Sequence, residues 1–154
     1  MTKSQIFALK TSSVLWVVWG LVHILAGVII LSTDASGGFA GVADAVDSAQ
    51  LTSDYHPAVG GILHQHGFNL LWIGVVTFAG AFFIWRGNLT AIWVTALVGG
   101  LADVGYFLFV DLPGFVNFVP GTLMTIFSGS AIVLSFWVAY SAKKIMSKSK
   151  LDPD

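Results

Sequence analysis

The stretch VLWVVWGLVHILAGVIIL, residues 14–31, decides the fold of this chain, because it is apolar apart from one histidine. A bilayer core about 30 Å thick takes roughly 20 helical residues, so a run of this length predicts a membrane-spanning helix. Three more such runs follow, over about 59–85, 89–110 and 115–140. None alternates strictly between apolar and polar residues, as a membrane β-barrel strand must. The sequence therefore predicts an all-α, polytopic membrane four-helix bundle, with residues 1–154 in one domain.

The composition supports the same class of protein. Of the 154 residues 56% are hydrophobic and 10% are charged, and the mean hydropathy is +0.84. Soluble domains carry about 25% charged residues, so this chain cannot cover a water-facing surface, which excludes a soluble enzyme. A net charge of −1 provides no basic field for nucleic acid. The absence of cysteine excludes disulfides, iron–sulfur clusters and thiol catalysis. The expected partner is the lipid bilayer.

The basic residues predict an orientation. They lie in three segments, before the first run, between the second and third, and after the fourth: Lys3, Lys10, Arg86, Lys143, Lys144, Lys148 and Lys150. Four crossings place these segments on one side, which the positive-inside rule makes cytoplasmic. We therefore expect both termini in the cytoplasm, with residues 141–154 as a polar cytoplasmic tail.

The first outer loop, residues 32–58, is the one long connection. Apolar residues recur in it at helical spacing: Phe39, Val42, Val46 and Ala49. This pattern predicts a short amphipathic helix on the outer membrane surface, bounded by Gly37-Gly38 and Thr52-Ser53. The loop is expected to act either as a lid or as an inert cap.

Polar residues inside the apolar runs share one depth. From the helical rise, His23 lies roughly 12 Å below the outer end of its helix and Asp103 roughly 10 Å. His64 and His66 lie roughly 7–11 Å deep, and Thr122 roughly 10 Å. Ionisable groups in the membrane are costly and usually mark a site, so we expect a site in the outer half of the bilayer. The inner half shows no such band in the sequence.

Imidazoles with a carboxylate are typical ligands of zinc, iron or copper. We therefore predict a metal ion held by His23, Asp103 and one or both of His64 and His66. Residues two apart on a helix point about 200° from each other, so either one histidine faces inward or nearby glycines let both converge. His66 is slightly favoured, because it shares a helix face with Asn69.

Other residues are expected to surround this site or to pack the helices. The predicted surrounding side chains are Asn69, Trp19, Trp72, Thr122 and Thr125. The tryptophans as a group are expected near helix ends or facing lipid. Close helix packing is predicted at Gly20, Gly27, Gly60-Gly61 and Gly99-Gly100.

Two segments carry a resemblance to a known group of proteins. GLVHILAG at residues 20–27 and FNLLWIG at residues 68–74, with the four-run layout, resemble small DoxX-like and related uncharacterised bacterial membrane proteins. The resemblance implies a multi-pass protein of the bacterial inner membrane. It carries no catalytic residues across.

Several functions remain open from the sequence. The leading hypothesis is a metal-binding membrane protein, and its more specific form is a small oxidoreductase that acts on a lipid-soluble substrate. A variant places a b-type haem between His23 and His64 or His66. A transporter or proton relay would use Asp103 and His23, although the sequence shows no polar path in the inner half. The last alternative is a non-catalytic subunit of a homo-oligomer or membrane complex.

Overall fold

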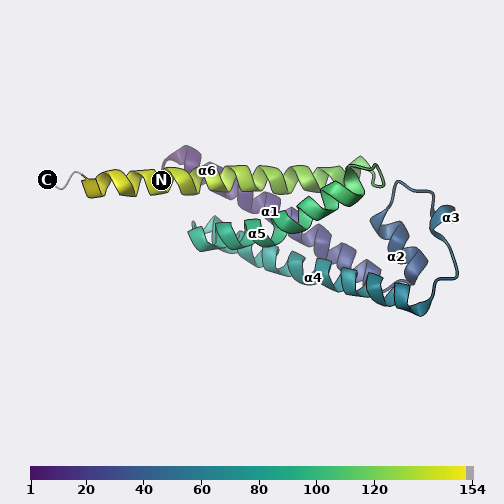
Figure 1. Cartoon of the computed structure of the whole chain (residues 1–154). Helices are drawn as coiled ribbons and strands as arrows, with labels where there is room; N and C mark the ends of the chain where they lie inside the picture. Colours follow the sequence, from purple (N-terminus) through teal and green to yellow (C-terminus); the bar gives the residue numbers. More distant parts are fainter. Residues whose placement is uncertain (152–154) are drawn as a thin grey trace.

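The computed structural model describes the backbone of residues 1–151 and the side chains of residues 1–141. Within the described residues every regular element is a helix (Figure 1). Four stretches are long and apolar enough to cross a membrane: Lys3–Leu31, Pro57–Trp85, Leu89–Asp111 and Phe118–Ser141. The predicted all-helical architecture with four candidate spans is therefore confirmed.

Helix α1 (Lys3–Leu31) begins well before the predicted start at residue 14. Thr2 and Gln5 form a capping box. The backbone N–H of Gln5 donates to Thr2 Oγ1 (3.2 Å), and the backbone N–H of Thr2 donates to Gln5 Oε1 (2.8 Å). This cap lets residues 3–13, several of which are polar, join the helix. Hydropathy alone does not show this extension. α1 packs against both α4 (Pro57–Trp85) and α6 (Leu123–Leu151).

Glycines set the close crossing of α1 and α4. A Cβ atom built on Gly27 would lie 2.6 Å from the Gly67 carbonyl oxygen, and one on Gly20 would lie 2.9 Å from the Gly74 carbonyl oxygen. The two glycines on each helix are seven residues apart, so they lie on one face and let the backbones approach. The prediction of close packing is confirmed for Gly20 and Gly27.

The other two predicted glycine pairs differ. A Cβ on Gly99 would lie 2.6 Å from the Trp16 ring, and one on Gly100 would lie 2.9 Å from Ile132, so this pair does pack closely. Nothing lies within 4 Å of a Cβ on Gly60 or Gly61, so that prediction is wrong. These two glycines lie in the first turns of α4, beyond its close crossing with α1.

Helices α5 (Leu89–Tyr106) and α6 complete the bundle. A tight turn with Gly87 at φ +78° joins α4 to α5, and Asn88 caps α5 by accepting from the Ala91 amide (3.0 Å). α5 continues into a π-helical turn, η1 (Phe107–Asp111), and a second one, η2 (Phe118–Thr122), leads into α6. α6 extends to Leu151, while the side chains of the predicted tail, from residue 142 onward, lie outside the described residues.

The long loop contains two short helices, α2 (Ala35–Val42) and α3 (Ser48–Leu51), rather than the single predicted one. Asp34 caps α2 by accepting from the Gly37 amide (2.8 Å), so the glycine pair lies inside this helix instead of bounding it. Between the helices, the Asp44 carboxylate accepts from the backbone N–H of Asn117 (2.7 Å). This bond ties the loop to the α5–α6 connection, just after the end of α2.

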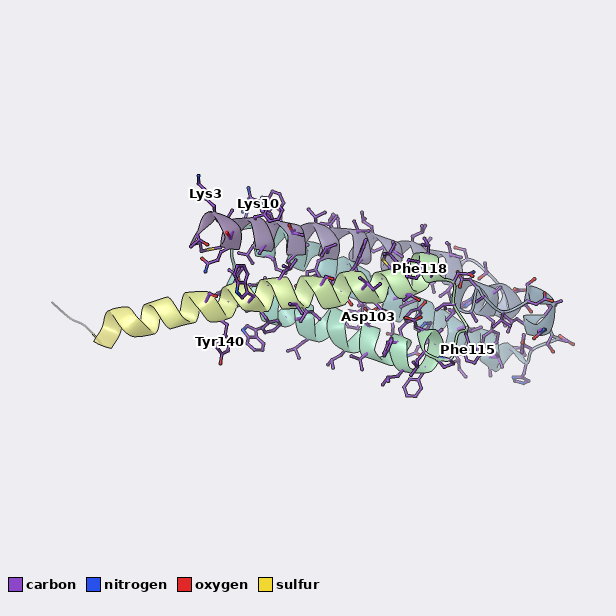
Figure 2. The ribbon with its side chains drawn as sticks, turned by 90° about the horizontal axis from the view of Figure 1, so that it is seen from above. Lys3, Lys10, Asp103, Phe115, Phe118 and Tyr140 are labelled. Carbon is purple, nitrogen blue, oxygen red and sulfur yellow. The ribbon has the colours of Figure 1, made fainter. Side chains whose placement is uncertain are left out.

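The basic residues Lys3, Lys10 and Arg86 gather at one end of the bundle. Lys3 and Lys10 lie at one end, opposite Phe115 and Phe118 (Figure 2). The Lys10 Nζ lies 4.9 Å from the centroid of the Trp85 ring. Trp85 is followed in the sequence by Arg86, which begins the α4–α5 turn. We call this the basic end, and we call the end that carries α2 and α3 the loop end.

The basic-end half contains several buried hydroxyl groups. Ser12 donates to the Ala131 carbonyl (2.8 Å), and Ser13 donates to the Ala81 carbonyl. Thr77 and Ser135 donate to carbonyls of their own helices, while the buried Thr95 hydroxyl has no partner among the described side chains. The basic-end half therefore buries several hydroxyl groups, a different kind of polar group from the His and Asp side chains of the predicted band. Ser12 and Ser13 were overlooked because the first helix was predicted to begin after them.

Candidate functional site

A cavity of about 90 Å³ lies between the helices in the loop-end half. Four polar side chains line it: His23, His66, Asp103 and Tyr106. The remaining wall is apolar and includes Val22, Ala26, Ile30, Leu70 and Met124, with Gly41 and Val42 of α2 nearest the loop end. A water molecule needs about 10–15 Å³ on this measure, so the cavity has room for a small organic group.

Asp103 anchors the site from α5 and is only 4% exposed. Figure 2 shows it within the bundle, toward the Phe118 end. Its Oδ1 accepts from the indole Nε1 of Trp19 on α1 (3.2 Å), and its Oδ2 accepts from the hydroxyl of Ser128 on α6. A buried carboxylate needs such partners, because burial removes its hydration. Asp103 therefore joins three helices and holds the Trp19 ring in place.

His23 lies one helical turn from Trp19 and stacks on it. The two ring centroids are 3.5 Å apart and the ring planes differ by 18°. The His23 Nδ1–H donates to the Trp19 carbonyl oxygen at 2.8 Å, because a carbonyl can only accept. The other ring nitrogen, Nε2, has no hydrogen-bond partner among the described residues. The ring is thus fixed by Trp19, while Nε2 remains available on a cavity-lining residue.

The structure separates the two neighbouring histidines of α4. His66 lines the cavity and makes no hydrogen bond within the described residues. The His64 Nε2 lies 3.0 Å from the Thr33 carbonyl oxygen at the end of α1, and His64 does not line the cavity. Because α4 is an uninterrupted α-helix here, positions two apart face different directions.

Of the five predicted surrounding residues, Trp19 is the one that contacts the site directly. Asn69 and Trp72 bond to each other, with the Trp72 indole donating to Asn69 Oδ1 (3.1 Å), and neither lines the cavity. Thr122 donates to Asp111 (2.7 Å), and the buried Thr125 hydroxyl has no partner in the described part of the chain. These four residues therefore lie outside the cavity lining.

Burial also corrects the interpretation of the tryptophans. Trp16 and Trp19 are 0% exposed and pack edge to face, with centroids 5.6 Å apart. Four others are exposed, as expected of lipid-facing or interfacial residues: Trp72, Trp85, Trp93 and Trp137. Trp19 was expected beside the site, whereas hydropathy could not identify Trp16 as buried, because every face of a membrane helix is apolar.

The sequence interpretation missed Tyr106 as a member of the site. Tyr106 lies three residues after Asp103, so both side chains share a face of α5, a spacing that could have identified it. A Cβ built on Gly121 would lie 3.0 Å from the Tyr106 hydroxyl oxygen, so the glycine leaves room for this phenol. Ser128, the second partner of Asp103, was not among the predicted site residues.

The predicted metal ligands form an incomplete set. Among the described residues no group of three His, Cys, Asp or Glu side chains is placed to hold one metal ion. Two imidazoles, His23 and His66, line the cavity, and both Asp103 oxygens already accept hydrogen bonds. The metal site stays a prediction, and the geometry itself describes a mainly apolar cavity with a few polar groups.

Comparisons with protein-family models, with curated proteins and with solved structures find no match for this chain. The resemblance to DoxX-like proteins therefore stays a prediction, and the functional argument rests on the site geometry.

Proposed function

We propose that this protein is an integral membrane protein that binds a small lipid-soluble molecule in the cavity between its helices. Ligand sites are typically concave and mostly apolar, with a few polar groups that fix the orientation of the ligand. This cavity has aliphatic walls, and His23, His66 and Tyr106 supply the polar contacts. The observation that carries the proposal is the His23 ring, held by Trp19, whose Nε2 has no hydrogen-bond partner in the part of the chain that the structure describes.

The support for binding rather than transport comes from the residues on the basic-end side of the cavity. Trp19 and Trp16 lie about one and two turns below His23 on α1, and both are fully buried. Their packed rings lie between the cavity and the basic-end half. The arrangement favours a site that a ligand enters and leaves on one side.

The proposed orientation follows from the charges. Lys3, Lys10 and Arg86 at the basic end favour the cytoplasmic side under the positive-inside rule. The cavity would then lie in the outer half of the membrane. Together with the resemblance to bacterial proteins, this favours the bacterial inner membrane as its location.

The test measures binding of 2-naphthol and of its methyl ether, 2-methoxynaphthalene, by equilibrium dialysis in detergent, against protein-free micelles of the same detergent. The blocking variant is Ala26→Phe, which fills the cavity from α1. The matched control is Val28→Phe, which adds the same ring two residues away at an exposed position. We expect the wild type and Val28→Phe to retain probe and Ala26→Phe to lose it. Equal retention of both probes by all three proteins would contradict the proposed function.

A metal ion is the second candidate, and one observation favours it. Metal-bound histidines usually donate their other ring nitrogen to a carbonyl or carboxylate, as His23 does to Trp19. His23 and His66 would supply two ligands, and water or a bound molecule would supply the rest. Elemental analysis and absorption spectra of the purified protein test this candidate and its haem variant. A colourless protein without stoichiometric zinc, iron or copper would rule out both, and with them metal-based redox chemistry.

A further inference from the structure

The geometry points to the chemical class of the ligand: an uncharged alcohol or phenol whose hydroxyl group donates a hydrogen bond to His23 Nε2. This inference rests on the proposed function, because it assigns the polar end of the molecule bound in the cavity. It is drawn from the hydrogen-bonding capacity that the site leaves unused.

The first step is the tautomer of His23. Its Nδ1 lies 2.8 Å from the Trp19 carbonyl oxygen, which has no proton to give. Nδ1 must therefore carry the ring proton of a neutral imidazole, and Nε2 then has a free lone pair. The Trp19 carbonyl belongs to the backbone of α1, so this assignment is fixed by the helix itself.

The second step is the charge of the ring. The site carboxylate, Asp103, accepts from Trp19 and Ser128, and its hydrogen bonds do not include His23. One face of the His23 ring is covered by the Trp19 indole. A charged imidazolium in this apolar cavity would lack a paired anion, which is costly. The neutral ring, with Nε2 as an acceptor, is therefore the form presented to a ligand.

The third step is the group that satisfies this acceptor. A ligand ether or ketone cannot donate to Nε2 and would leave two lone pairs facing each other. A hydroxyl group can donate to Nε2, and its oxygen can accept from the phenol of Tyr106, which lines the same cavity. An anionic ligand would place its charge against the Nε2 lone pair and has no donor proton for it. The apolar walls formed by Val22, Ile30 and Met124 suit the hydrocarbon part.

The experiment compares the two naphthalene probes, which have nearly the same shape but differ in one donor proton. The test variant is His23→Asn, whose Nδ2 can still donate to the Trp19 carbonyl and whose acceptor, Oδ1, ends short of the position of Nε2. The matched control is His64→Asn, which changes the same residue type on α4 outside the cavity. Dialysis is run as above, and each retained amount is corrected for partition into micelles.

We expect the wild type to bind 2-naphthol about two- to tenfold more tightly than its ether, which is the range for one net hydrogen bond. His64→Asn should keep this preference, and His23→Asn should lose it. Equal binding of both probes to the wild type would overturn the hydroxyl assignment while leaving the proposed function intact. Tighter binding of 1-naphthylmethylamine, a cationic donor, than of 2-naphthol would overturn the uncharged class. The wild-type comparison decides the inference even if His23→Asn fails to fold.

Discussion

The two halves of the bundle both bury polar groups, but they use them differently. In the basic-end half, Ser12 and Ser13 donate to carbonyls of neighbouring helices and thereby join those helices. In the loop-end half, His23 lines a cavity, and within residues 1–141 its ring makes one hydrogen bond, through Nδ1, while Nε2 has no partner. The comparison shows that a polar residue among membrane helices indicates a site when part of its hydrogen-bonding capacity stays unused beside open space.

Side-specific labelling tests which half of the bundle faces which side of the membrane, and its expected effect is the largest because labelling is all or none. The natural chain has no cysteine, so single substitutions Ser53→Cys in the loop and Ser4→Cys at the basic end can be labelled selectively. We expect a membrane-impermeant maleimide to modify Ser53→Cys in intact bacterial cells and Ser4→Cys only after lysis. The reverse pattern would invert the proposed orientation of the cavity.

Replacing the tryptophan between the two halves should have the largest effect on stability. Trp19→Leu removes a fully buried ring and the donor to Asp103, so we expect a loss of up to about 3–5 kcal/mol, the range for large core truncations. Trp93→Leu, at an exposed position, is the control. Chemical unfolding in detergent measures both. An equal loss of unfolding free energy in the two variants would show that Trp19 does not hold the halves together.

Removing the carboxylate acceptor should have an intermediate effect. Asp103→Leu leaves the Trp19 indole and the Ser128 hydroxyl without their acceptor, at a cost of about 1–3 kcal/mol. Asp103→Asn keeps an oxygen for Trp19 and should cost less. We also expect Asp103→Leu to weaken 2-naphthol binding, since His23 stacks on the released ring. A variant that is stable and still binds at wild-type affinity would argue against this positioning role.

Removing a hydroxyl in the basic-end half should have the smallest effect. Ser12→Ala deletes one interhelical hydrogen bond, and such bonds average about 0.6 kcal/mol in membrane proteins. Probe binding should stay at the wild-type level, because Ser12 does not line the cavity. The same unfolding and dialysis measurements apply. A several-fold drop in 2-naphthol affinity would mean that the two halves are coupled.

The prediction of a shared depth was informative about some residues and misleading about others. His23, His66 and Asp103 do line one cavity, whereas Thr122 at a similar depth bonds Asp111 instead. Depth follows from residue position along a helix, which sequence provides directly. The direction in which a side chain faces depends on how the helices are rotated about their axes, and apolar runs carry little information about that rotation.

The sequence by itself determined that the chain forms four helices able to cross a membrane, because an apolar run of sufficient length must satisfy its backbone internally. It also contained the local pairs, such as His23 one turn from Trp19. Only the tertiary structure decided that His66 rather than His64 lines the cavity, and that Trp19 donates to Asp103 across 84 residues of sequence. The physical reason is that lipid favours every face of these helices equally, so close packing at Gly20 and Gly27 and the buried hydrogen bonds choose the inward faces.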